Sequence, residues 1–248
     1  MRRLLFSLGI IILSLNIGVK ANAGYLIADL STKNIILNYD FKGQYITISG
    51  ISTGVEEIII SVDGPVRAYR VWKKEKINGL WINAKSFTIP SEHSYFFLAS
   101  TKDLYSIADL DTLRDLALDY QFENYQVQER YPQLQFDRFK EEFKLYRQAL
   151  KLYPTKVESI ERIGENIFRA KFYIPNYAYS GKYDVSIYAF TKGKEVNNIH
   201  LSFEVGKQGL YAAIDEISKR EPLKYAVYAI LIALSAGLIA GFLFRKDR

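Results

Sequence analysis

A mainly β fold is what the sequence predicts: a periplasmic β-sandwich, immunoglobulin-like in type, with a helical insertion, joined to one C-terminal transmembrane helix. Three observations predict it. Short runs of β-branched and aromatic residues fill two stretches of the chain, a stretch with helical periodicity separates them, and twenty uncharged positions precede the last four residues. The 248 residues suffice for one folded domain of about 200 residues and two terminal segments.

The N-terminal segment predicts export. Two arginines at positions 2 and 3 precede an apolar stretch over 4–19, and Ala21-Asn22-Ala23 follows. A basic start, an apolar middle and a small-residue exit are the parts of a secretory signal. We therefore expect a signal peptide over 1–23, with or without cleavage after Ala23, and a periplasmic domain over 24–206.

Strand-like residues dominate the first and last parts of that domain. The candidate strands of the first part are 35–38, 45–49, 58–62, 69–72, 80–83, 86–89 and 95–99. Apolar and polar residues alternate again over 167–174, 181–190 and 199–205, as expected for half-buried antiparallel strands. Tyr183 stands near the start of one of these strands, where a tyrosine ties the corner of immunoglobulin-like sandwiches.

Residues 103–153 predict the helical insertion. Apolar residues recur at helical spacing in a first series, Leu104, Ile107, Leu113, Leu116, Ala117 and Tyr120. A second series has steps that alternate between three and four, namely Phe136, Phe139, Phe143, Tyr146, Leu150 and Tyr153. We expect two helices whose seam packs on the protein's own sheet. The alternative is a docking face for a partner helix.

The C-terminal segment predicts one membrane span. Residues 225–244 carry no charge, and at 1.5 Å per residue they extend about 30 Å, the thickness of a bilayer's hydrocarbon core. We expect a transmembrane helix over 223–244 and a cytoplasmic tail over 245–248, whose three cations satisfy the positive-inside rule. Residues 207–222 predict an amphipathic juxtamembrane helix, or alternatively an upward continuation of the spanning helix.

Charge and composition exclude several functions. The formal charge is +6, of which the signal carries three and the tail two, which leaves +1 for residues 24–224. Such a domain has no general attraction for nucleic acid. With no cysteine, the chain has neither disulfides nor thiolate chemistry. His93 and His200 lack metal-ligand spacing, and motifs for phosphate binding or nucleophilic catalysis are missing. We expect no enzyme activity, no metal and no cofactor.

A basic, aromatic segment is the first candidate site. Both tryptophans of the chain lie within it, beside several cations. The candidate surface for a ligand or partner consists of Arg67, Arg70, Trp72, Lys73, Lys74 and Trp81. It suits an anionic ligand, lipid head groups or an acidic protein face, with tryptophan providing contact area. The alternative is an exposed hairpin whose tryptophans pack inward.

A stripe of small residues in the predicted span is the second candidate. Ala229, Ala233, Gly237 and Gly241 recur every four positions. Small residues at this spacing let membrane helices approach closely. The stripe therefore predicts association with a membrane-protein partner or a second copy of the chain.

Several short motifs resemble a known family. They are Leu26-Ile-Ala-Asp-Leu-Ser31, Phe41-Lys-Gly43 with Ile46-Thr-Ile-Ser-Gly50, Val62-Asp-Gly-Pro65, Trp72-Lys-Lys-Glu75 with Gly79-Leu-Trp-Ile-Asn83, and Gly209-Leu210 with Glu221-Pro-Leu-Lys-Tyr225. Through them nearly the whole chain resembles the transmembrane protein family of alphaproteobacteria called Alph-Pro-TM. The resemblance implies a Gram-negative inner membrane and a periplasmic domain, and it supplies no site residues.

Two functional hypotheses follow. In the first, the protein is a single-pass inner-membrane accessory or assembly subunit that presents its β domain to a multi-spanning partner, such as a permease. In the second, it is a membrane-anchored periplasmic binding module for an anionic solute or envelope component.

Overall fold

The computed structural model describes residues 24–119, 133–207 and 210–244. The signal peptide predicted over 1–23 and the tail predicted over 245–248 lie outside the described residues, as does Tyr120 of the first helical series.

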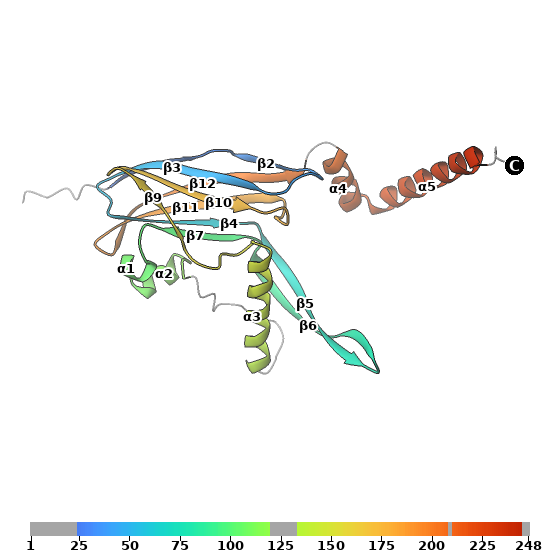
Figure 1. Cartoon of the computed structure of the whole chain (residues 1–248), viewed down its shortest axis with the longest axis horizontal. Coiled ribbons are helices and arrows are strands. Elements are labelled where there is room, and N and C mark those ends of the chain that lie inside the picture. Colours follow the sequence, from blue (N-terminus) through green and yellow to red (C-terminus); the bar gives the residue numbers. More distant parts are fainter. Residues whose placement is uncertain (1–23, 120–132, 208–209, 245–248) are drawn as a thin grey trace, which may run out of the picture.

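Two β-sheets form the body of the molecule (Figure 1). The four-stranded sheet has the order β1 (Tyr25–Leu30), β3 (Gln44–Thr53), β10 (Ile167–Ile174) and β9 (Glu161–Ile163). The six-stranded sheet has the order β2 (Asn34–Leu37), β12 (Lys194–Lys207), β11 (Gly181–Thr191), β4 (Glu57–Asp63), β7 (Phe96–Ser100) and β8 (Glu158–Ser159). The mainly β fold class is therefore confirmed.

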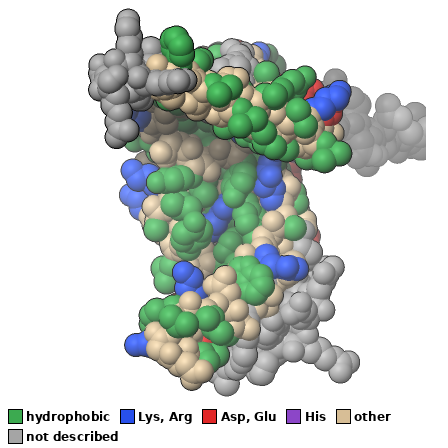
Figure 2. Space-filling model, turned by 90° about the vertical axis from the view of Figure 1, so that its right-hand side faces the viewer, with side chains coloured by type: hydrophobic (Ala, Val, Ile, Leu, Met, Phe, Trp, Pro, Cys, Tyr) green, Lys and Arg blue, Asp and Glu red, His purple; other side chains and the backbone are tan. Residues whose placement is uncertain are grey.

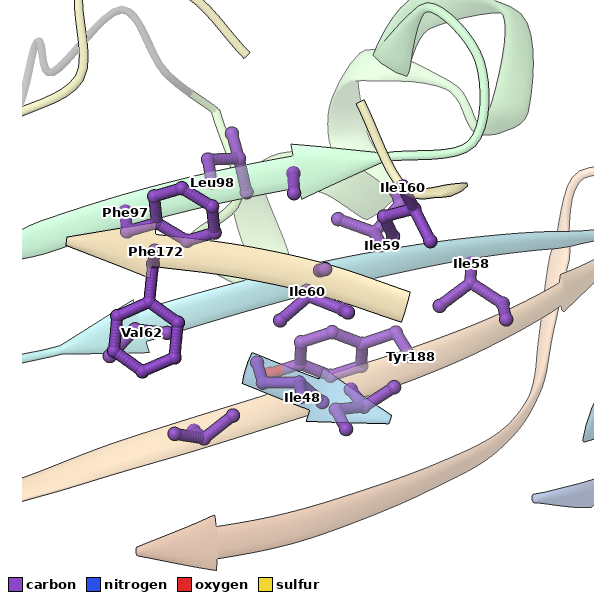
Figure 3. Close-up of a cluster of buried hydrophobic side chains, with 14 of the residues drawn as sticks. Ile48, Ile58, Ile59, Ile60, Val62, Phe97, Leu98, Ile160, Phe172 and Tyr188 are labelled. Atoms are coloured by element: carbon purple, nitrogen blue, oxygen red, sulfur yellow. The ribbon is translucent and has the colours of Figure 1, made fainter. Parts of the chain in front are cut away.

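One hydrophobic core joins the two sheets. Phe172 of β10 contacts Phe97 of β7 and Phe203 of β12, with ring centroids 5.6 and 5.7 Å apart. Figure 3 shows Phe172 and Ile48 from the first sheet among side chains of β4 and β7 from the second. Because inward residues of both sheets share this cluster, the arrangement is a sandwich.

The corner contact predicted for Tyr183 is present. Its hydroxyl donates a hydrogen bond to the carbonyl oxygen of Tyr179 at 2.9 Å, and its side chain is fully buried. The ring also stacks on Phe203, with 5.0 Å between centroids. The immunoglobulin-like assignment of the whole sandwich stays a prediction.

Strand β4 is buried on both faces, because helical segments add to the core. Ile58, Ile59, Ile60 and Val62 are all fully buried. The helices α1 (Leu104–Ile107) and α2 (Leu110–Asp115) contribute three buried side chains to the same core cluster, namely Leu104, Ile107 and Leu113. Leu104, Ile107 and Leu113 of the first helical series thus lie in two short helices on the protein's own core. Leu116 and Ala117 were predicted to continue the helix, but they follow the end of α2, and Ala117 has a positive φ angle of 55°. Asp109 begins the second of them by accepting a hydrogen bond from the Thr112 amide at 2.8 Å.

A long hairpin leaves the body between β4 and β7 (Figure 1). It consists of β5 (Val66–Ile77) and β6 (Leu80–His93), which pair only with each other. The turn residues Asn78 and Gly79 both have positive φ angles, 49° and 86°, as the two-residue turn of a twisted hairpin requires. The stretches 80–83 and 86–89, predicted as separate strands, are parts of the single strand β6.

The second helical series forms helix α3 (Gln133–Ala149), but the residues that are buried differ from the predicted seam. Phe139 and Phe143 are buried, whereas Tyr146 is 61% exposed, and Leu150 and Tyr153 follow the end of the helix. The side chain of Phe136 is outside the described part of the chain. The buried stripe instead steps by four, through Phe139, Phe143 and Arg147. Phe143 contacts Tyr69 of β5 at 5.5 Å, so α3 packs on the hairpin of the same chain.

Two helices end the described chain. They are α4 (Leu210–Arg220) and α5 (Pro222–Phe244), which meet at Glu221 and run in different directions in Figure 1. Within α5, Pro222–Phe242 is apolar and long enough to cross a membrane, and it is the one such segment among the described residues. None of it is buried against the rest of the protein.

Candidate functional site

A cavity lies between the hairpin and α3, near the hairpin's base. Its volume is about 520 Å³, within the range of small-molecule sites. Six aromatic side chains line it: Tyr69, Trp72, Phe143, Tyr146, Tyr177 and Tyr179. The cationic side chains in its wall are Arg70 and Arg147. An aromatic wall that carries two guanidinium groups suits a ligand that is apolar in part and anionic in part.

Arg147 is the most unusual residue of this cavity. Its side chain is only 2% exposed, although arginine is rarely buried without a counterion. Its guanidinium carbon lies 4.9 Å from the ring centre of Tyr69, 5.8 Å from Phe143 and 5.0 Å from Tyr153. This aromatic cage offsets part of the cost of burying the charge.

The Arg147 side chain makes one well-formed hydrogen bond within the described residues, and its charge also interacts with the Tyr69 hydroxyl. One Nη atom donates a hydrogen bond to the carbonyl oxygen of Ser94, while Nε has no partner. No carboxylate of the described chain lies within ion-pair distance of the guanidinium. A buried cation without a paired anion is costly, so this site has unused capacity to bind a negative group.

The charge of Arg147 acts on the carboxyl group of Glu92, which is a weak counterion. Burial raises the pKa of the Glu92 carboxyl, while Tyr153, His93 and Arg147 act in the opposite direction. The hydroxyl of Tyr153 donates to Glu92 Oε1 at 2.7 Å. Because burial favours the neutral acid, Glu92 only partly balances the charge of Arg147.

The environment of the cavity also shifts the pKa of one tyrosine in its aromatic wall. Burial raises the pKa of the Tyr69 hydroxyl, with Arg147 lowering it to a smaller extent. That hydroxyl is buried and has no hydrogen-bond partner among the described atoms. Tyr69 therefore stays neutral at physiological pH and offers the cavity an unused donor.

The predicted surface divides into three parts in the structure. Arg70 and Trp72 line the cavity, and the guanidinium of Arg70 lies 5.9 Å from the Trp72 ring. Arg67 points to a neighbouring hollow, where it lies 4.6 Å from the Tyr179 ring and donates to the Ser180 carbonyl at 3.4 Å.

The other predicted cations and Trp81 belong to the outer half of the hairpin. Lys73 pairs with Glu75 at 3.2 Å, and Lys74 is exposed. Trp72 is 46% exposed and Trp81 69% exposed. The alternative of a hairpin with inward-packed tryptophans is therefore wrong.

Sequence reasoning missed Arg147, because it searched α3 for apolar residues alone. A usable signal was present: Arg147 follows Phe143 by four positions and Phe139 by eight, on the same helical face.

Each of the two histidines has a hydrogen-bond partner on a neighbouring strand or turn. His93 Nδ1 lies 2.9 Å from the Gly64 carbonyl, and His200 Nδ1 lies 3.0 Å from the Ser186 hydroxyl. Clusters of three or more metal-ligating side chains are missing from the described ranges.

The small-residue stripe lies on α5, away from the cavity. Nothing lies within 4 Å of where a Cβ would stand on Gly237 or Gly241, so this face is open. Ala229 and Ala233 share it, because all four positions recur at intervals of four. The structure therefore leaves the stripe available to a neighbouring helix.

A family model described as "Putative transmembrane protein (Alph_Pro_TM)" matches residues 25–246. The chain belongs to this family. No curated protein matches it. Membership of the Alph_Pro_TM family and the apolar helix α5 together fit a single-pass membrane protein.

Proposed function

We propose that this protein is a membrane-anchored binding module, whose β domain holds an anionic ligand in the cavity at the base of the hairpin, on the periplasmic side of an inner membrane. The carrying observation is Arg147, a buried guanidinium that lacks a carboxylate partner and lies in the wall of an aromatic cavity. The proposal is one of binding without chemical conversion.

The geometry restricts the class of ligand. Arg147 and Arg70 supply the charge, and the planar guanidinium favours a carboxylate, sulfate or phosphate group that accepts two parallel hydrogen bonds. Tyr69, Trp72 and Tyr179 supply surfaces for an apolar or aromatic portion. Glu142 also lines the cavity, but it pairs with Arg138 at 3.7 Å, which reduces its repulsion of an anion.

Thermal unfolding of the full-length protein in mild detergent tests this proposal. The probes are inorganic sulfate, inorganic phosphate, benzoate and phenyl phosphate, each compared at equal ionic strength. A ligand present at 100 times its Kd stabilises the folded state by about 2.7 kcal/mol. For a domain of this size that stabilisation raises Tm by roughly 5–11 °C.

Three variants make the test specific. Arg147→Lys keeps the charge but removes the planar donor pair, and Arg70→Gln removes the second cation. Arg169→Gln is the matched control, because Arg169 is an exposed arginine on β10 outside the cavity wall. We expect the first two variants to lose most of the ligand-induced shift and the control to keep it. Equal shifts in all three variants, or no shift in the wild type, would contradict the proposal.

A second candidate function rests on a different observation, the open stripe on α5. As an accessory subunit, the protein would associate through Ala229, Ala233, Gly237 and Gly241 with a multi-spanning partner or with its own copy. Replacing Gly237 and Gly241 by leucine should abolish recovery of that partner after cross-linking in native membranes. Ser235→Leu adds similar bulk to the opposite face and serves as the control. Unchanged recovery in the glycine variant would remove this candidate.

A further inference from the structure

The outer half of the hairpin, residues 73–85, extends away from the body of the protein. The ring contacts of the hairpin with α3 and with the loop before β11 come from its inner half, from Tyr69 and Arg67. From Lys73 to the turn at Asn78, five residues at about 3.3 Å each carry the chain roughly 16 Å outward. The side chains at the far end are therefore presented to whatever surrounds the protein.

The tip of this hairpin, residues 76–82, carries exposed apolar side chains on both faces. Ile77 lies opposite Leu80 in the ladder, and Lys76 lies opposite Trp81. Since opposed residues share a face and successive pairs alternate, Ile77 and Leu80 occupy one face and Trp81 the other. Leu80 is 70% exposed, and Ile77, Trp81 and Ile82 are exposed as well. A groove in a protein would cover one face of such a ribbon, whereas a fluid apolar medium covers both.

Cations flank the tip in the sequence. Residues 70–85 contain five cations and a single acid: Arg70, Lys73, Lys74, Lys76 and Lys85 against Glu75. This segment of sixteen residues carries +4, while the whole span 24–224 carries +1. The basic charge of the exported part is thus concentrated behind the apolar tip. Clusters of four or more cations beside apolar anchors are typical of surfaces that bind anionic lipids.

The tip and the membrane helix lie at the same end of the molecule. In Figure 1 the hairpin extends from the body toward the side where α4 and α5 lie. Figure 2 faces that side and shows hydrophobic side chains gathered over the helix above and over the hairpin tip below, with Lys and Arg beside the tip. A bilayer crossed by α5 is therefore the apolar surface nearest to the tip.

We infer that the hairpin tip inserts into the interface of the membrane that α5 spans. Ile77, Leu80 and Trp81 enter the boundary between head groups and acyl chains, where tryptophan is enriched in membrane proteins. Lys73, Lys74 and Lys76 remain at the level of the head groups and contact anionic lipid, with their aliphatic stems along the apolar surface.

The two tryptophans provide a native probe, because the chain contains no others. Full-length Trp72→Phe protein, which keeps Trp81 alone, is reconstituted into vesicles of phosphatidylcholine and phosphatidylglycerol that contain acyl-brominated lipid. We expect the bromine to quench Trp81 fluorescence by about half, because insertion to roughly 5–10 Å places the ring near the acyl chains. The matched Trp81→Phe protein keeps only Trp72 at the cavity, and its quenching should be less than about a third as large.

Two further variants test the two parts of the inference. Leu80→Asp, made in the Trp72→Phe protein, changes an exposed side chain, so it should abolish lipid quenching without unfolding the domain. Changing Lys73, Lys74 and Lys76 together to Gln should reduce insertion into anionic vesicles by on the order of fivefold per cation. In vesicles of phosphatidylcholine alone, the same change should have little effect.

Acrylamide, an aqueous quencher, separates the alternatives. Strong quenching of Trp81 by acrylamide, with none by brominated lipid, would overturn the inference because the tip would lie in water. Protection of Trp81 from both quenchers would also overturn it, because a second copy or another protein would then cover the tip. Neither result depends on the anion-binding cavity, so failure here leaves that proposal standing, and the reverse holds too.

Discussion

Phe172 is the residue at which the sandwich is most directly testable. Its ring is 1% exposed and contacts aromatic rings on two strands of the opposite sheet. Phe172→Ala removes those contacts and leaves a cavity, which costs about 3–5 kcal/mol for a buried phenylalanine. At roughly 2–4 °C per kcal/mol for a domain of this size, Tm should fall by about 6–20 °C.

Circular dichroism of the full-length protein in detergent is the suitable assay. Both tryptophans lie in the hairpin, so their fluorescence reports on the hairpin and not on the core. The control is Ile167→Ala on the same strand, where the side chain is exposed and the expected change is within about 0.5 kcal/mol. A loss below about 1 kcal/mol for Phe172→Ala would refute the face-to-face packing of the sheets.

Three further predictions concern stability. Gly50→Ala should cost about 1–3 kcal/mol in chemical unfolding, because the added methyl group would overlap the Ile27 carbonyl oxygen and a neighbouring aromatic ring. Burial raises the pKa of Tyr183 from 10.0 to about 12, so up to about 3 kcal/mol of stability should be lost as pH rises from 10 through 12. Tyr183→Phe should remove that part of the alkaline loss, and an unchanged alkaline profile would argue against it. Burial favours a higher pKa for Glu57, but Lys102 and other partners outweigh it and hold the pKa below 4.5. Stability should therefore fall as pH drops below 4.5, and less steeply in Lys102→Gln, as acid titration of Tm would show.

Local patterns predicted the strands of the body well where one face is buried. Strand β10 follows the predicted alternation residue by residue, because Phe168, Ala170, Phe172 and Ile174 all point into the core. Strand β1 was not among the candidate strands, although Leu26 and Leu30 point inward at the same spacing. Its short run closely follows the apolar N-terminal stretch of the sequence, which hides the change in periodicity.

The helical insertion was predictable in place but not in detail. A search for apolar spacing selects Tyr146 and passes over Arg147, yet Arg147 is the buried member. A guanidinium becomes a tolerable core group only when aromatic rings from distant strands surround it, and such contacts are set by tertiary packing. The cavity was unpredictable for the same reason, since its wall combines β5, α3 and the loop before β11.

The hairpin shows a different limit. Its cations and tryptophans were found as a group, but the sequence alone left open whether the tryptophans pack inward. The described side chains of the outer half of the hairpin form no buried face, so alternation there no longer indicates direction. In the structure the predicted surface divides into a cavity wall with Arg70 and Trp72, a neighbouring hollow with Arg67, and the exposed outer part of the hairpin.

The placement of β12 has a mechanical consequence. This strand is the last of the body. Its residues Glu204 and Val205 are held between β11 and the parallel strand β2, and β2 continues the pairing as far as Lys207 through Asn34–Leu37. A pull on the membrane helix would load β12 lengthwise, so that its hydrogen bonds to both neighbours bear the force together in shear instead of opening one after another. We therefore expect the body to resist unfolding when tension is applied through α5.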